Sequence, residues 1–143
     1  MNWDNLGRPG DDLTDFIGHM TALRRRFAQL RSQRWLDGRR KDGSYGVLWL
    51  TPAAEEMKEA DWNFPEGRFL AYVLAPMEQG QAPIFIVLNA APEEIAFTLP
   101  RMTEYKNWQQ VLNTTEPQTV AAFASGSETK APPRSVLAFA GAA

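Results

Sequence analysis

Short apolar segments separated by turn residues extend from residue 46 to the C-terminal end, and they constrain the fold more than any other feature. Each has the length of a β-strand, is rich in branched and aromatic residues, and is bounded by Pro, Gly or Asn. The segments are residues 46–51, 69–75, 83–90, 94–100, 108–114, 118–123 and 135–141. Short strands at turn-sized spacings are typical of an antiparallel sandwich or barrel, so the sequence predicts a mainly β fold.

Three stretches allow more detailed predictions. Apolar residues alternate in 94–99, so Ile95, Phe97 and Leu99 are expected to face one side of a half-exposed strand. Residues 83–90 are apolar almost throughout, which indicates a central strand. Residues 124–135 are polar and contain two prolines, so we expect a loop there.

An amphipathic helix is predicted before the strands. Asp11 or Asp12 can cap its first turn, and Arg31 and Arg34 suit the negative end of its dipole. Apolar residues recur every three or four positions and form one face, which we call the helix stripe: Leu13, Phe16, Ile17, Met20, Leu23, Phe27 and Leu30. The predicted helix ends before Asp37, and its stripe requires a substantial apolar partner.

The predicted architecture is therefore one long amphipathic α-helix followed by an antiparallel β-sandwich of about seven or eight strands, of Greek-key type. Residues 1–36 form the N-terminal segment with the helix, and residues 37–143 form the sandwich domain. A single helix leading into a sandwich indicates the tail of a larger protein.

Composition excludes several classes of protein. The chain has 143 residues and no cysteine, so it has neither a disulfide framework nor a thiolate metal site. No apolar run has the length of a membrane span, and the polar start is unlike a signal peptide. We expect a cytoplasmic protein without membrane contact, metal or cofactor.

A basic segment at residues 24–41 raises the question of nucleic-acid binding. Arg24, Arg25 and Arg26 are consecutive, so they point around the helix and do not form one phosphate-facing stripe. No nucleic-acid recognition motif accompanies the charge. We expect no nucleic-acid partner.

Candidate catalytic groups are few. His19 is the one histidine, and a structural or surface role is expected for it. Glu55, Glu56, Glu59 and Asp61 are the right residue type for glycoside hydrolysis, but such acid pairs come from separate elements of a scaffold. We therefore expect no catalytic residue in this chain.

Aromatic residues are the candidates for carbohydrate binding. Trp62, Tyr105 and Trp108 lie beside turn-like segments, where a ring can stack on a sugar. Core packing is the competing interpretation for each of them, and Trp49 is expected to lie in the core.

Several motifs carry a family resemblance. "WLTPAAEEMKEADW" (49–62) resembles the pattern W-L-x-P-D-G-x-E-M-x-x-x-D-W of bacterial glycogen debranching enzymes of the isoamylase type, in the α-amylase superfamily of glycoside hydrolases. Ala53 and Ala54 replace the usual Asp-Gly, which predicts a different local turn. "DFIGHMTALRRRFAQLR", "IVLNAAPEEIAFTLP", "WQQVLNTTEP" and "RSVLAFAG" are also similar to segments of that family, in the same order.

The resemblance implies a role. The helix resembles the last helix of the family's catalytic barrel, and the remainder resembles its C-terminal β-sandwich domain. The family's catalytic carboxylates lie upstream in that barrel, so the resemblance implies a non-catalytic domain that stabilises it. Met57 and Trp62 are then expected to turn inward, and Asp61 to cap a local turn or pair with an arginine.

Alternative roles remain open. The helix stripe can pack on the sandwich, associate with a second copy, or dock on a separate protein. The chain can also be a stand-alone module that binds glycogen or a malto-oligosaccharide through Trp62, Tyr105 or Trp108.

Overall fold

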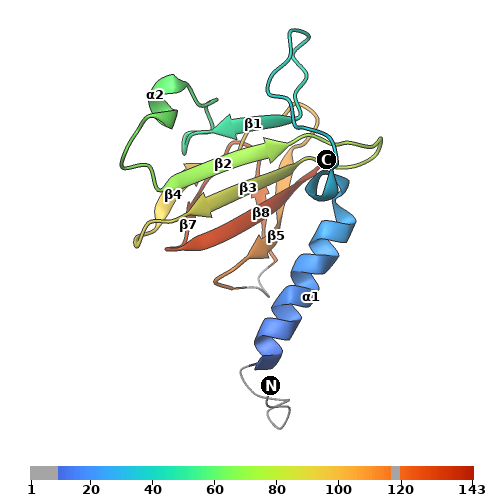
Figure 1. The fold of residues 1–143 in the computed structure, drawn as a ribbon, viewed down its shortest axis with the longest axis vertical. Helices are drawn as coiled ribbons and strands as arrows, with labels where there is room; N and C mark the ends of the chain where they lie inside the picture. The colour runs from blue at the N-terminus through green and yellow to red at the C-terminus, as the bar shows by residue number, and fades with distance from the viewer. Residues whose placement is uncertain (1–9, 117–119) are drawn as a thin grey trace.

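Within the residues that the computed structural model describes, 10–116 and 120–143, eight strands form two antiparallel sheets (Figure 1). The larger sheet has the strand order β1-β2-β3-β8-β5-β6, and the smaller pairs β4 with β7. The strands are β1 (Val47–Leu50), β2 (Phe69–Leu74), β3 (Ile84–Asn89), β4 (Ile95–Thr98), β5 (Asn107–Asn113), β6 (Ala122–Ala124), β7 (Glu128–Ala131) and β8 (Ser135–Ala142). The predicted mainly β fold, with a helix before the strands, is confirmed.

The helices are α1 (Gly10–Arg26), the short 3-10 helix η1 (Ala28–Arg31) and the one-turn α2 (Glu59–Trp62). The C-terminal half of α1 lies against the larger sheet, whereas its N-terminal half extends past the sheets (Figure 1). One face of the larger sheet therefore packs on the smaller sheet, and the other packs on α1 and η1.

Strand β3 shows how the larger sheet is buried on both faces. Phe85 and Val87 point toward the smaller sheet, whereas Ile84 and Ile86 join the cluster that covers the α1 side. The last strand, β8, lies between β3 and β5 and pairs with both. The prediction of a central strand at 83–90 is confirmed.

The core between the sheets is largely aromatic. Trp108 is fully buried, and its indole Nε1 donates to the carbonyl of Pro100 at 2.9 Å. The buried residues of this core are Leu50, Ala71, Val73, Phe85, Val87, Phe97, Leu99, Trp108, Ala131, Leu137 and Phe139. Phe97 and Leu99 face this core while Ala96 is exposed, as the alternation in 94–99 predicts.

Neighbouring loops cover the outer edge of β1. The amide of Val47 donates to the carbonyl of Asp37 at 3.0 Å, and the amide of Met57 donates to the carbonyl of Trp49 at 2.9 Å. An uncovered edge strand can pair with another chain, so these contacts protect the sheet from such pairing.

The prediction of one helix continuing to about residue 36 is wrong. Helix α1 ends at Arg26, and Phe27 has extended backbone angles (φ −106°, ψ 105°) before η1 begins. Phe27 is buried against the sheet, and the side-chain amide of Gln29 donates to the carbonyl of Ala82 at 2.8 Å. These contacts with the sheet and with the loop before β3 turn the chain out of the helix.

The predicted loop at 124–135 is also wrong in part, because it contains β7. Residues 128–130 are polar and show no apolar alternation, yet together with Ala131 they pair with β4 along its whole length. The strand predicted at 118–123 overlaps β6, which comprises residues 122–124. Residues 117–119 lie outside the described part of the chain.

Candidate functional site

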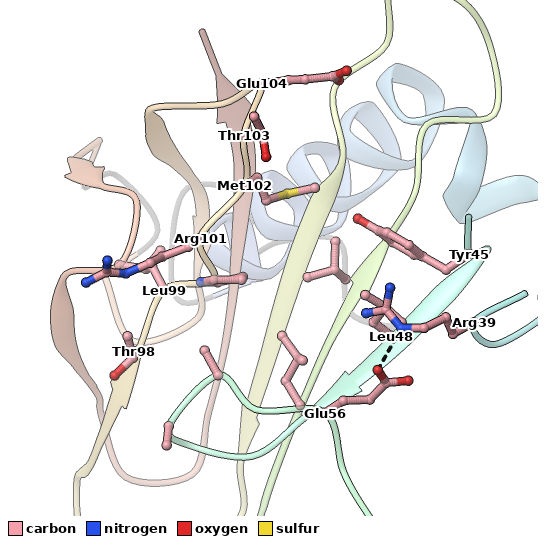
Figure 2. A pocket seen from close by; sticks show the side chains of 15 residues that line it. Arg39, Tyr45, Leu48, Glu56, Thr98, Leu99, Arg101, Met102, Thr103 and Glu104 are labelled. Carbon is pink, nitrogen blue, oxygen red and sulfur yellow. Dashed lines mark hydrogen bonds and ion pairs between the residues drawn. The ribbon is translucent and has the colours of Figure 1, made fainter. Parts of the chain in front are cut away.

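A cleft opens at one edge of the sandwich, between β1 and the chain that follows β4 (Figure 2). Its volume of about 620 Å³ is within the range of small-molecule sites in proteins. Buried side chains of Leu50, Val73 and Leu99 line its inner part. The polar lining comes from the loop before β1, the turn after β1 and residues 98–104. We call this feature the edge cleft.

An ion pair joins two walls of the edge cleft. Nε of Arg39 donates to Oε2 of Glu56 at 2.9 Å, and both side chains are about half exposed. Arg39 forms a backbone bridge with Tyr45, and Glu56 forms one with Leu50. The pair therefore ties the loop before β1 to the turn that follows it.

Tyr45 stands beside this ion pair, and its hydroxyl points toward the middle of the edge cleft (Figure 2). Burial raises the pKa of Tyr45 above its usual value of 10.0. The hydroxyl therefore stays protonated at neutral pH and can both donate and accept a hydrogen bond.

A tight turn shapes the hairpin that carries Arg39 and Tyr45. The hydroxyl and the amide of Ser44 donate to Oδ1 of Asp42 at 2.6 and 2.9 Å. These hydrogen bonds hold the pKa of the Asp42 carboxyl below its usual value of 3.8. The turn closes with Gly43 at a φ of +84°, a conformation that glycine adopts without strain.

The four carboxylates of residues 55–61 do not meet at one site. Glu56 pairs with Arg39 in the edge cleft, whereas Oδ2 of Asp61 accepts from the amide of Lys58 at 2.8 Å and caps α2. Glu55 and Glu59 are exposed. The prediction that Asp61 caps a local turn is confirmed, and nothing in this arrangement resembles an acid/base pair.

The helix stripe is covered over only part of its length. Leu23 and Phe27 are buried against the larger sheet, and Phe16, Met20 and Leu30 are partly buried beside them. Leu13 is 63% exposed and Ile17 is 55% exposed. The stripe therefore packs on the sheet at five positions between Phe16 and Leu30, and Leu13 and Ile17 are its exposed members.

Comparison with protein families gives one match, to the family described as "Isoamylase, C-terminal", over residues 46–137. This range covers more than half of the chain and runs from the residue before β1 into β8. The chain belongs to the isoamylase C-terminal domain family. Comparison with curated proteins gives no match.

Membership of the isoamylase C-terminal domain family confirms the resemblance that the sequence motifs carry. This domain is a non-catalytic part of a glycoside hydrolase. Helix α1 and most of the hairpin that carries Arg39 precede the matched residues, whereas the 98–104 wall and Glu56 fall within them.

In the turn at residues 51–54, Ala53 and Ala54 stand where the related sequence pattern has Asp-Gly. Ala54 has a φ of +60°, in the left-handed region that glycine occupies without strain. Its amide donates to the carbonyl of Thr51 at 2.9 Å, which closes the turn. The backbone at residue 54 thus has a conformation suited to glycine although the residue is alanine.

Trp62 lies on the outside of the isoamylase C-terminal domain. It is 51% exposed, and its ring packs in a T-shaped arrangement with that of Trp49 at a centroid distance of 5.5 Å. The expectation that it turns inward is wrong for Trp62, because α2 lies at the surface and contributes no buried residue. Met57 is partly buried.

The other two predicted carbohydrate-binding residues are separate from Trp62. Trp108 packs on Phe85 inside the core and has no accessible ring face, so a sugar cannot stack on it. Tyr105 is partly buried, and its hydroxyl donates to the carbonyl of Gln81 at 3.4 Å. The three residues therefore do not form a common platform.

His19 and the acidic residues give no sign of a metal site. Nε2 of His19 is 3.0 Å from the carbonyl oxygen of Val111, so the imidazole helps to hold α1 on the sheet. Across residues 10–116 and 120–143, no group of three His, Cys, Asp or Glu side chains could hold a metal ion. The same residues contain no helix that is long and apolar enough to span a bilayer.

The sequence carries no local signal for the edge cleft. Arg39 and Tyr45 come from a polar hairpin, and the 98–104 wall is far from them in sequence. In the sequence, Glu56 is recognisable only as a member of a local acidic cluster. No local pattern marks an ion pair between residues that become neighbours only when β1 joins its sheet.

Proposed function

We propose that this chain is the C-terminal domain of an isoamylase-type enzyme that hydrolyses α-1,6-glucosidic branch linkages in glycogen. Its role is to stabilise the catalytic barrel of that enzyme, and it supplies no catalytic residue. The family match over residues 46–137 supports the kind of enzyme. The uncovered part of the helix stripe supports the role.

The observation that supports this proposal most directly is that the sheet covers only part of the helix stripe and leaves the rest exposed. Leu23 and Phe27 anchor α1 to the sandwich, whereas Leu13 and Ile17, nearer its N-terminal end, are more than half exposed. Burial of one such aliphatic side chain stabilises a complex by about 1.5–3 kcal/mol. A helix that is anchored to one domain and still exposes apolar side chains is suited to bridge two domains.

An apolar groove enlarges this surface. It has a volume of about 450 Å³ and lies between α1 and the outer face of the larger sheet. Ile17 and Met20 line it from the helix, and Ile86, Leu88 and Val136 line it from the strands. A barrel that covers Ile17 would also close this groove, which adds apolar burial to the contact.

The test is to add the chain to an isoamylase-type catalytic barrel prepared without its own C-terminal domain. We expect the chain to bind the barrel and to raise its midpoint of thermal unfolding. Ile17→Asp places a charge in the contact and should weaken binding by at least about tenfold, or about 1.4 kcal/mol. Binding is measured by calorimetry, and branch-linkage hydrolysis is followed in parallel.

Ala22→Asp is the matched control, because Ala22 is exposed and lies on the other side of the same helix. It introduces the same residue into the same helix and should leave binding unchanged. No binding by the unchanged chain, or equal losses for both variants, would contradict the docking role.

Sedimentation and a glycogen titration separate the alternatives. A dimer that Ile17→Asp dissociates would instead support self-association through the helix stripe. Saturable quenching of tryptophan fluorescence by glycogen, lost in Trp62→Ala, would support a glucan-binding module, for which the half-exposed ring of Trp62 is the supporting observation.

A further inference from the structure

The edge cleft lies in a different part of the domain from α1 and has no role in the proposed docking. It combines an apolar interior with polar walls. Leu50, Val73 and Leu99 close its inner end, and Leu48 and Met102 line it further out. Its volume of about 620 Å³ exceeds what a few water molecules need and is within the range of small-molecule sites.

Several hydrogen-bonding atoms of the edge cleft have no partner within residues 10–116 and 120–143. Among the described residues, the hydroxyl of Tyr45 and Oε1 of Glu56 form no hydrogen bond, and the same holds for the hydroxyl of Thr103. The ion pair with Arg39 fixes the Glu56 carboxylate through its other oxygen, Oε2. Free donors and acceptors that are already held in place bind a ligand with a smaller loss of conformational entropy.

The charges that line the edge cleft balance. Arg39 is neutralised by Glu56 at 2.9 Å. The guanidinium of Arg101 points away from Tyr45 and Arg39 in Figure 2, and its side chain lies close to Gly126, where a Cβ would come within 2.5 Å of its Nε. Glu104 supplies the remaining charge at the rim. The cleft thus lacks the cluster of positive charge that a phosphate requires, and its two carboxylates belong to no group of side chains in the described residues that could hold a metal ion.

A neutral molecule that presents hydroxyl groups at its edges and C–H groups on its faces matches both kinds of surface. Its hydroxyls would bond to Tyr45, Glu56 and Thr103, while its apolar faces contact the aromatic ring and the aliphatic interior. We propose that the edge cleft is a binding site for a neutral, hydroxyl-rich ligand with the chemistry of a short oligosaccharide. Tyr45 and Glu56 are its principal hydrogen-bonding residues.

The test is a titration of the ¹⁵N-labelled chain with two neutral trisaccharides, maltotriose and cellotriose, and with inorganic phosphate, followed by amide chemical shifts. At least one sugar should produce saturable shifts at residues 39–56 and 98–104. Tyr45→Phe and Glu56→Gln should each weaken this binding about tenfold, which corresponds to about 1.4 kcal/mol. Both variants should remain folded, because each keeps the size of the side chain and the ion pair is exposed.

Matched controls exist for both substitutions. Glu55→Gln changes an exposed neighbour that does not line the cleft, and Tyr72→Phe changes a tyrosine that packs on the α1 side of the larger sheet. Neither should alter binding.

Three results would overturn the proposal. One is the absence of shifts with both sugars, and another is a response confined to the residues around Trp62. The third is that inorganic phosphate shifts the cleft amides at lower concentrations than either sugar. None of these results bears on whether α1 docks on a catalytic barrel, so the two proposals are tested separately.

Discussion

Ala54 carries a side chain that conflicts with its backbone conformation. Its φ of +60° lies in the left-handed region, which costs an alanine about 1–2 kcal/mol relative to glycine. Glycine loses part of this advantage because its unfolded chain is more flexible. The wall of the edge cleft that includes Ala54 is thus stable despite a local strain.

We expect Ala54→Gly to stabilise the domain by about 0.5–1 kcal/mol, because it removes the strain at this turn. The measurement is the free energy of unfolding in urea. Ala53→Gly is the matched control: Ala53 does not have a positive φ, so glycine there should be neutral or destabilising. Equal effects of the two substitutions would show that the φ of Ala54 is not a source of strain.

Among the helices and strands, the local sequence pattern predicts those strands that have an apolar face. It does not predict the elements whose position depends on contacts with residues distant in sequence. β3 and β4 follow their alternation or continuous apolarity. β7 has only Ala131 as a buried residue, and it exists because β4 offers a free edge. The end of α1 at Arg26 depends on the contact of Phe27 with the sheet and of Gln29 with the loop before β3, which no residue between 26 and 36 signals.

The candidate site was less predictable than the strands for the same reason. Asp61 was identified correctly because its cap is a contact over three residues. Arg39 and Glu56 pair across 17 residues, and the opposite wall joins them only through the packing of two sheets. Trp62 and Trp108 both lie beside turns in the sequence, yet one is half exposed and the other is fully buried.

This difference in burial gives a prediction for two tryptophans. Trp108→Ala leaves a cavity in the inter-sheet core and removes the indole hydrogen bond to the carbonyl of Pro100, so it should cost about 3–5 kcal/mol or prevent folding. Trp62→Ala loses the contact with Trp49 and part of its burial, and should cost about 1–2 kcal/mol. Chemical denaturation measures both values.

If Trp108→Ala does not fold, Trp108→Phe provides the comparison, because it keeps an aromatic ring in the core. It should still cost more than Trp62→Phe. A larger cost at Trp62 than at Trp108 would show that α2 is packed more closely on the domain than its exposure indicates.

The whole molecule consists of three layers, with the larger sheet between the smaller sheet and α1. Both faces of β3 and β8 are buried as a result, which explains why these two strands are apolar on both faces. The sequence predicted the sandwich and the helix before it, and the layer order follows from the helix stripe and the sheet sharing one apolar cluster. The family match begins after α1, so it does not say whether the helix belongs to the folding unit.

Energetics can decide whether α1 and the sandwich fold together. Leu23 is 7% exposed and belongs to the apolar cluster between α1 and the larger sheet. Leu23→Ala should therefore lower the free energy of unfolding by about 2–4 kcal/mol. Leu13→Ala is the same substitution at an exposed position of the same helix. It should change the free energy of unfolding by no more than about 0.5 kcal/mol.

Urea unfolding followed by helix and tryptophan signals measures both variants. If α1 is part of one cooperative unit, Leu23→Ala shifts the two signals together. A shift of the helix signal alone would make α1 an independently unfolding appendage. In that case the helix would have to be ordered by the partner it docks on, and the exposed Leu13 and Ile17 would form only part of a larger contact.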